Sequence, residues 1–227
     1  SFELALKSDP ISAYGGIVSC NFRIDKKMAK ELNKIFLEVV IGIGISKEAL
    51  KEFKRKKNLR VIDSTKFKIG NFEHINSSYN NMLIQSSDFK NLSRKNFKVV
   101  SKIKPSKKSF KNLIFAFNIC RFVKSNAIVI VKEDSTVGIG SGQTSRIDSC
   151  KIAIKKMQNF QKDLYKSEII AASDAFFPFT DGPETLAHSG VTTIVQPFGS
   201  IRDKEIIKYA NQTNTILVFS KNRYFRH

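Results

Sequence analysis

Apolar and polar residues follow two different periods along this chain, and the periods alternate from one segment to the next. Short runs of β-branched and other apolar residues predict buried strands, whereas apolar residues three and four positions apart predict amphipathic helices. In the second half, the predicted strands cover 127–131, 136–140, 168–172, 191–195 and 215–219. The predicted helices there begin at Pro105-Ser106 and cover 145–161, 183–188 and 203–210. We expect the first two strands to pair as a hairpin across Glu133-Asp134.

The first half carries the same alternation in shorter segments. Strands are predicted at 17–22, 38–41 and 58–62, and helices at 25–36 and 46–56. From Ser64 to Val100 the pattern becomes polar, which predicts an extended hairpin or meander. Strands that alternate with helices predict an α/β layered fold with a mixed sheet, and we expect a boundary near 101–105.

The composition supports a packed core. The chain has 227 residues, of which 41% are hydrophobic and 11% aromatic, enough for one sizeable domain or two small ones. No run approaches the roughly 18 apolar residues of a membrane span, and the N-terminal residues lack the pattern of a signal peptide. Cys20, Cys120 and Cys150 are scattered in apolar contexts. They predict reduced core thiols in a cytoplasmic protein, not a disulfide set or a metal site.

The formal net charge of +19 raises the possibility of nucleic-acid binding, since lysine and arginine release counterions from phosphates. However, the basic residues are spread along the chain. The densest clusters, Lys54–Lys57 and Lys107-Lys108, fall where a solvated helix face or a helix start is expected. No zinc-finger spacing or aromatic-basic ribonucleoprotein string is present in the sequence. A small anionic substrate would benefit from the same positive field, so nucleic-acid binding is the more distant hypothesis.

The segment Ser173–Gly182 is unusual because it places three phenylalanines and two aspartates between a predicted strand and a predicted helix. The phenylalanines are Phe176, Phe177 and Phe179. Aromatic rings beside carboxylates in such a loop suit a site for a flat polar ring. Alternatively, the rings belong to the core, and Asp181 and Glu184 form a capping-box variant at the helix start.

Two further segments have both a structural and a functional interpretation. Gly138–Arg146 is a glycine-rich turn that leads into a helix. It suits an anion at the helix N-terminus, with Arg146 as a planar donor, or it is a tight turn capped by Ser145. The turn matches neither the dinucleotide fingerprint nor a Walker loop. Asn126 either ends the preceding helix or orients a substrate amide or amine.

The C-terminal part contributes two more motifs. Ser200–Asp203 predicts a capping box, which we interpret as structural. The tail Asn222–His227 places arginines and aromatics directly after the last predicted strand. A terminal histidine is usually frayed, but these neighbours make the tail, with His227, a candidate for docking against the fold.

Together these segments resemble a known family. The segments 124–128, 138–146, 173–182, 196–203 and 223–227 occur in this order, and Asp9–Gly16 matches near the start. The chain resembles the C-terminal part of the AICAR transformylase domain of the bifunctional purine biosynthesis proteins. The resemblance covers essentially the whole chain, and its motifs are long and specific.

The resemblance implies a cytidine-deaminase-like α/β fold, duplicated within the domain, with one partial subdomain at 1–103 and a second at 104–227. It implies transfer of a formyl group from 10-formyltetrahydrofolate, a cosubstrate, to the 5-amino group of AICAR, giving FAICAR in IMP biosynthesis. It also implies a cytoplasmic homodimer with shared active sites. No metal, membrane or nucleic-acid partner is implied for this chemistry.

The resemblance also carries residue roles by matched position. The AICAR-side residues would be Gly15, Glu38, Asn126, Arg223 and Phe225, with Arg223 at the phosphate and Asn126 at the amine and carboxamide. The folate-side residues would be Arg146, Phe176, Phe179 and Asp181. Asn126 and the terminal His227 are the catalytic candidates.

The chain departs from the family pattern at several places. The Lys-His-x-Asn-Pro-Cys-Gly catalytic motif and the IMP cyclohydrolase domain are not among these 227 residues. We therefore expect a fragment, or one part of a split enzyme, that turns over little by itself. The alternative is a non-catalytic subunit that completes a site on another polypeptide. Thr180, Phe198 and Ile43-Gly44 also replace the usual residues, which affects the expected folate contacts and loop shape.

Overall fold

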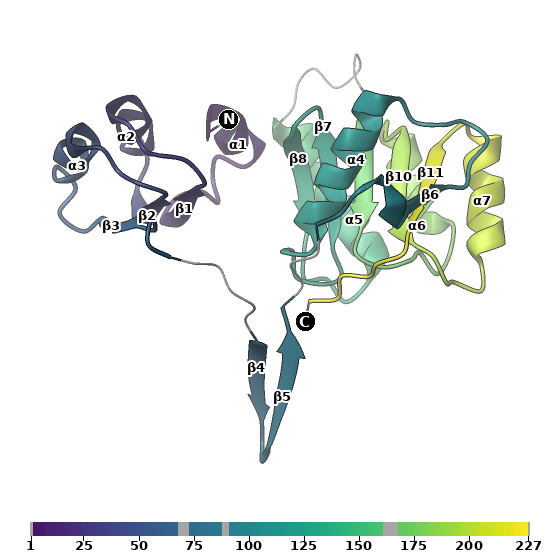
Figure 1. Ribbon diagram of the computed structural model, residues 1–227. Helices are drawn as coiled ribbons and strands as arrows, with labels where there is room; N and C mark the ends of the chain where they lie inside the picture. Colours follow the sequence, from purple (N-terminus) through teal and green to yellow (C-terminus); the bar gives the residue numbers. More distant parts are fainter. Residues whose placement is uncertain (1, 68–72, 88–90, 161–167, 227) are drawn as a thin grey trace. The chain divides into compact units, whose positions relative to one another are not determined.

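The computed structural model describes residues 2–67, 73–87, 91–160 and 168–226. These residues form two compact units, and each is described separately (Figure 1). The larger unit comprises 1–8 and 89–227, and the smaller unit comprises 9–88. The predicted subdomains at 1–103 and 104–227 remain a prediction about the family architecture.

The larger unit is built on a six-stranded mixed sheet in the order β6-β11-β10-β9-β7-β8. The strands are β6 Phe97–Val99, β7 Ile128–Lys132, β8 Ser135–Gly140, β9 Ile169–Ser173, β10 Thr193–Pro197 and β11 Ile216–Ser220. Strands β9, β10 and β11 are parallel, whereas β6 and β7 run antiparallel to β11 and β9. The predicted hairpin of β7 and β8 is confirmed, as is the mixed α/β class. The cytidine-deaminase-like assignment stays a prediction.

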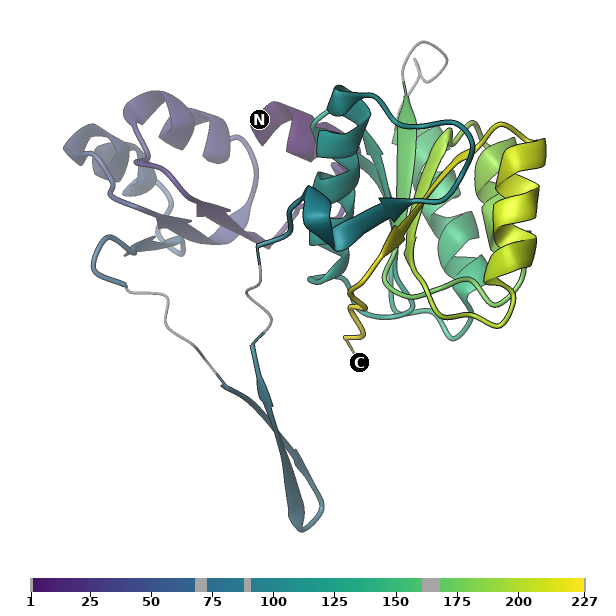
Figure 2. The same ribbon diagram turned by 45° about the vertical axis from the view of Figure 1, so that its right-hand side comes forward.

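Helices cover both faces of this sheet. The long helices are α4 Lys107–Cys120, α5 Arg146–Phe160, α6 Asp181–His188 and α7 Asp203–Gln212. Helix α4 packs on the face that presents Val129, Ile170 and Val218, and α5, α6 and α7 pack on the opposite face. Figure 2 shows α4 and α7 on opposite sides of the sheet. Burial on both faces explains why the central strands are continuous apolar runs instead of alternating ones.

Helix starts in the larger unit depend on short polar side chains. Ser106 caps α4 by accepting a hydrogen bond from the Ser109 N–H at 3.1 Å, as its position before the helix predicts. The predicted capping box at Ser200–Asp203 is wrong, because α7 begins only at Asp203 and Arg202 is its N-cap. Ser200 and Asp203 instead stabilise the preceding turn, accepting from the N–H groups of Arg202 and Gly199.

Helix α1, Phe2–Ser8, is an element that the hydrophobic pattern does not predict. It belongs to the larger unit and packs against β8 and α5, and Ser8 Oγ lies 3.3 Å from Thr136 Oγ1. Its side chains are mostly exposed or half-buried, so there is no strong periodic pattern to detect. A helix of this length is stabilised by tertiary packing and not by its own propensity.

The smaller unit contains a three-stranded parallel sheet and a separate hairpin. The sheet comprises β1 Gly16–Cys20, β2 Leu37–Gly42 and β3 Arg60–Asp63, and its helices are α2 Lys26–Leu32 and α3 Lys47–Phe53. These elements confirm the predicted alternation, although α2 ends four residues earlier than predicted, where Asn33 is the C-cap. The polar region forms the predicted hairpin from β4 Glu73–Ser78 and β5 Asn81–Ser86, whose residues are all exposed. The short turn η1 Arg94–Asn96 precedes β6 in the larger unit.

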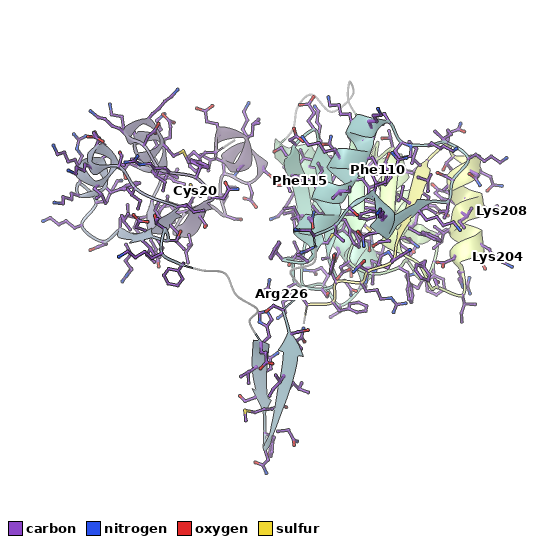
Figure 3. All side chains as sticks on the ribbon, in the orientation of Figure 1. Cys20, Phe110, Phe115, Lys204, Lys208 and Arg226 are labelled. Carbon is purple, nitrogen blue, oxygen red and sulfur yellow. The ribbon has the colours of Figure 1, made fainter. Side chains whose placement is uncertain are left out.

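The densest basic clusters lie on solvated surfaces, as the sequence predicts. Lys204 and Lys208 project outward from α7 in Figure 3, whereas Ile206 on the same helix is buried. Lys54–Lys57 and Lys107-Lys108 are also exposed, the first after α3 and the second at the start of α4. Of the helices in the part of the chain that the structure describes, none has the length and hydropathy to cross a membrane.

Candidate functional site

Most of the predicted site residues lie at one edge of the six-stranded sheet. Parallel strands β9, β10 and β11 end at this edge, and the pairing of Ile128 with both Gly140 and Ser173 brings the start of β7 and the end of β8 to the same place. The segments that follow or precede these strand ends are 121–127, 141–146, 174–180, 198–202 and 221–226. Ligands of open α/β sheets bind at the carboxyl ends of the strands. This edge is therefore the candidate site.

The three phenylalanines after β9 have different environments. Phe177 is 1% exposed and belongs to the core, as the structural interpretation predicts. Phe176 is half-buried, and Phe179 is 52% exposed. Because a large apolar ring on the surface loses the benefit of burial, the exposure of Phe179 is the feature that a flat ligand would explain.

Two arginines lie over these phenylalanine rings. The guanidinium carbon of Arg223, after β11, is 4.6 Å from the centre of the Phe176 ring. The guanidinium carbon of Arg202, after β10, is 4.8 Å from the centre of the Phe179 ring. Each contact joins loops that follow different strands, and each leaves a cation beside an aromatic surface. Such a surface suits a ligand that combines a flat ring with an anionic group.

Asn126 and Arg146 contact each other at the same edge of the sheet. Arg146 Nη2 donates a hydrogen bond to Asn126 Oδ1 at 2.7 Å. The Asn126 amide nitrogen donates to the backbone oxygens of Gln143 at 2.9 Å and Thr144 at 3.1 Å. Both amide hydrogens therefore have protein partners. A ligand that approaches Asn126 meets the second lone pair of Oδ1, unless it displaces one of these carbonyls.

Arg146 forms an internal ion pair and does not line an open anion site. Its Nη1 contacts Asp174 Oδ1 and donates to Ser173 Oγ at 2.9 Å. The Arg146 side chain is 9% exposed and that of Asp174 is 0% exposed. Asp174 Oδ2 also accepts a hydrogen bond from Ser125 Oγ at 2.5 Å. The sequence analysis does not identify Asp174 or Ser125 as site residues; the signal that points to Asp174 is a charged residue directly after an apolar strand.

Packing accounts for the glycines before α5. A Cβ atom at Gly138 would lie 2.1 Å from Ala153 O, and one at Gly140 would lie 2.0 Å from Ser149 O. Both glycines are therefore required for the close approach of α5 to β8. Ser145 Oγ accepts from the Asp148 N–H at 3.2 Å, which is the predicted cap. The geometry favours the tight-turn interpretation over the anion site.

Asp181 and the C-terminal tail complete this edge. Asp181 is the exposed first residue of α6, where a carboxylate interacts favourably with the helix dipole. The capping-box alternative is not observed, because Thr180 is the N-cap and makes no side-chain cap bond. In the tail, Tyr224 is buried, whereas Phe225 is 51% exposed and Arg223 is exposed. His227 lies outside the residues that the structure describes.

The remaining predicted residues lie in the smaller unit. Gly15 has a φ of +72°, which favours glycine, and its N–H donates to Phe36 O at 2.9 Å. Glu38 is the exposed second residue of β2. The pairing of Gly16 with Leu37 brings both residues to the amino ends of β1 and β2.

The cysteines are not part of this site. All three thiols are free and buried. Burial raises the pKa of the Cys150 thiol to about 12 and raises the pKa of Cys120 as well. The predicted core thiols are confirmed, and such thiols are poor nucleophiles at neutral pH. Within residues 2–67, 73–87, 91–160 and 168–226, no group of three or more His, Cys, Asp or Glu side chains could hold a metal ion.

Comparison with known proteins extends over the whole chain. Residues 1–156 match the family model described as the AICARFT/IMPCHase bienzyme. The bifunctional purine biosynthesis protein PurH of Leptospira biflexa is 43% identical over 228 positions, which cover all of this chain and 44% of that protein. The PurH proteins of Buchnera aphidicola subsp. Acyrthosiphon pisum and of Aquifex aeolicus are 42% and 41% identical, again over all of this chain and 43% and 44% of theirs. The chain thus spans less than half the length of these relatives.

The family model and these three relatives agree with each other and with the resemblance that the sequence motifs carry. The match covers well over half of the chain, and the identities are far above the level at which only a fold is shared. The chain belongs to the AICARFT/IMPCHase bienzyme family.

Proposed function

We propose that this chain supplies substrate-binding residues for formyl transfer from 10-formyltetrahydrofolate to the 5-amino group of AICAR, giving FAICAR. The proposal belongs to purine biosynthesis, which the names of the PurH relatives state for those proteins. The observation that carries it is the pair of guanidinium–ring contacts, Arg223 on Phe176 and Arg202 on Phe179, at one edge of the sheet.

The chemistry of the substrates matches this edge. AICAR combines a flat ring with a phosphate, and the folate combines a flat ring with carboxylates. In the proposal, Arg223 pairs with the AICAR phosphate and Phe225 lies beside the nucleotide. Phe176, Phe179 and Asp181 serve the folate, and Arg146 is the fourth residue on the folate side. The net charge of +19 favours the encounter with both anions.

The reaction itself needs orientation more than reactive groups. The 5-amino group is a poor nucleophile, because its lone pair is delocalised into a ring that bears a carboxamide. Catalysis therefore requires a base for the amine proton, donors for the developing oxyanion and close alignment of the two substrates. In the proposal, Asn126 Oδ1 accepts from the amine and carboxamide region, and His227 is the second catalytic residue.

The proposal also assigns part of the chemistry to residues that this chain does not contain. The Lys-His-x-Asn-Pro-Cys-Gly motif is absent from the 227 residues, and the PurH relatives are more than twice as long. We therefore expect substrate binding without efficient turnover by the 227 residues alone. The assembly that we propose is a cytoplasmic homodimer, in which each active site draws residues from both subunits.

Binding and turnover test the proposal separately. AICAR and 10-formyltetrahydrofolate are titrated into the purified chain by calorimetry, and formyl transfer is followed by the tetrahydrofolate that forms. Saturable binding of both substrates with little turnover is the expected result. Failure to bind either substrate would contradict the function. Turnover close to that of the complete Aquifex aeolicus PurH protein would contradict the need for the missing motif.

A second candidate is a non-catalytic subunit that completes a site on another polypeptide. Both candidates predict that this chain raises the formyl-transfer activity of a complementing segment. A polypeptide that carries the Lys-His-x-Asn-Pro-Cys-Gly motif is mixed with this chain. Restored formyl transfer indicates a split enzyme whose site includes residues of this chain. Equal activity of that polypeptide with and without this chain excludes both forms of the proposal.

A further inference from the structure

Asp174 is a buried carboxylate that the proposed substrate contacts do not use. It follows β9 directly, and the residue is 0% exposed. Ser125, before β7, is also buried. Burying a charge is costly unless its oxygens are paired, so the partners of Asp174 indicate what it stabilises.

Each carboxylate oxygen of Asp174 holds a different segment of the site edge. Oδ1 pairs with Arg146, the first residue of α5, and Oδ2 accepts from Ser125 Oγ at 2.5 Å. Its backbone contacts the segment before β7 a second time and one further segment, the C-terminal tail. The Asp174 N–H donates to Ala127 O at 3.3 Å, and the Asp174 carbonyl accepts from the Tyr224 N–H at 3.0 Å. One residue therefore links the segment before β7, the start of α5 and the C-terminal tail.

The Arg146 branch of this network determines how the Asn126 amide is oriented. With Nη1 held by Asp174 and Ser173, Arg146 presents Nη2 to Asn126 Oδ1 at 2.7 Å. That donor requires the oxygen of Asn126 to face Arg146, and the amide nitrogen then faces the carbonyls of Gln143 and Thr144. Without the Asp174 carboxylate, the guanidinium would lose its buried counter-charge and this fixed position.

The Ser125 branch fixes the tail. Because the Ser125 hydroxyl donates to Asp174, its lone pairs are free to accept, and they accept from the Arg226 N–H at 3.0 Å. The Ser125 N–H in turn donates to Arg226 O at 2.8 Å. These bonds lie on one side of Phe225, and the bond from Tyr224 to Asp174 lies on the other. The backbone of the tail is therefore held on both sides of Phe225, and Arg223 directly precedes the held residue Tyr224.

We propose that Asp174 is a positioning residue for both halves of the site: through Arg146 it orients Asn126, and through Ser125 it docks the tail that carries Arg223 and Phe225. The docking needs no ligand. The consequence for AICAR affinity rests on the proposed function.

Trypsin cleavage of the ligand-free chain tests the docking. Arg223 is a cleavage site within the docked tail, whereas Lys208 is a cleavage site within α7 and reports global unfolding. Asp174→Asn keeps the size of the side chain but removes its charge, and Ser125→Ala removes only the hydroxyl. Both variants should increase the rate of cleavage after Arg223 about tenfold relative to Lys208, the ratio expected for loss of a charge-assisted hydrogen bond. The control is Asp134→Asn, an exposed carboxylate with a surface partner, Lys111.

The outcomes separate the inference from the proposed function. Native rates after Arg223 in Ser125→Ala would overturn the docking role, even if Asp174→Asn fails to fold. In the same preparations, AICAR affinity should fall about tenfold in the two network variants and stay unchanged in Asp134→Asn. Unchanged affinity in a variant whose tail is released would overturn the positioning of Arg223 and Phe225. If the unmodified chain does not bind AICAR, the proposed function fails, and the cleavage rates still decide the docking role.

Discussion

The guanidinium of Arg223 lies over the ring of Phe176, with its central carbon 4.6 Å from the ring centre. The two residues are separated by two strands in the sequence and meet only because β9 and β11 are parallel and end at the same edge. Gly199, between them in the sequence, has a φ of +112°, and a Cβ there would lie 3.1 Å from Arg223 Nη2. Residues from all three loops that follow the parallel strands thus meet at this pair.

Replacement of Arg223 by Lys should weaken AICAR binding although the charge is retained. Lysine has no planar guanidinium to stack on the Phe176 ring, and its ammonium cannot donate two parallel hydrogen bonds to a phosphate. We expect a loss of affinity of about tenfold for Arg223→Lys and a larger loss for Arg223→Ala. Calorimetric titration with AICAR measures both. The matched control is Lys221→Ala, an exposed cation two residues earlier; equal losses in that variant would indicate a general charge effect and contradict the specific role of Arg223.

Alanine at Gly138 should be strongly destabilising. Its Cβ would lie 2.1 Å from Ala153 O, so α5 would have to move away from β8. Overpacking of this kind costs about 1–3 kcal/mol, and more where the obstacle is backbone. The control is Gly190→Ala. Among the described residues its Cβ would have one neighbour within 4 Å, Ile169 Cδ1 at 4.0 Å, but the φ of Gly190 is +96°. That variant should lose only about 1–2 kcal/mol, the cost of a left-handed backbone. Urea unfolding measures the free energy of both variants. Equal losses would mean that the contact with α5 is not the reason why glycine is required at position 138.

The sequence predicts the helices and strands of this fold better than the tertiary contacts that they make. Apolar runs such as 127–131 and 168–172 predict strands because burial on both faces leaves a continuous pattern. The same reasoning does not predict which phenylalanines of the following loop are buried, since all three are equally apolar. It therefore does not distinguish Phe177 in the core from Phe179 on the surface. Their different exposure arises from the position of Gly182 and of the loops after β10 and β11, which is tertiary information.

Polar residues are harder to predict than apolar ones. The sequence identifies Arg146 and Asn126 as candidate site residues, but their contact depends on Asp174, whose role appears only when β9 lies beside β7. Likewise, Gly138 and Gly140 suggest an anion loop in the sequence, whereas the distances to α5 explain them by packing. A motif specifies residue types at given spacings, and the same types serve more than one physical purpose.

Cys120 and Cys150 should be protected from thiol reagents in the folded protein. Burial raises the pKa of Cys150 to about 12, so almost no thiolate is present at pH 8. Because the folded-state pKa lies above the unfolded one, the resulting stabilisation is fully present below the unfolded pKa and is lost as the pH rises through about 12. An aromatic disulfide reagent at pH 8 should label these two cysteines only in denaturant, at sites identified by mass spectrometry. Rapid labelling of either cysteine in the native protein would show that its helix opens readily.

Gly182 and Phe177 should be energetically coupled. A Cβ at Gly182 would lie 2.4 Å from Phe177 Cδ1, and the ring is buried in the core. Alanine is favoured over glycine in a helix by about 1 kcal/mol, so helix propensity alone predicts that Gly182→Ala is stabilising. We expect the steric contact to outweigh propensity, with a net loss of about 1–3 kcal/mol in urea unfolding.

The double variant distinguishes the two effects. Phe177→Leu by itself should lose stability because it leaves space in the core, but it removes the ring atoms that the new methyl group contacts. The loss of unfolding free energy in the double variant, Gly182→Ala with Phe177→Leu, should therefore be smaller than the sum of the two single-variant losses, by about 1 kcal/mol or more. If the two losses simply add, the loop shifts to accommodate the new methyl group instead of clashing with the ring of Phe177. In that case Phe179, two residues from Phe177, should move as well, and the affinity for 10-formyltetrahydrofolate should fall in the single variant Gly182→Ala.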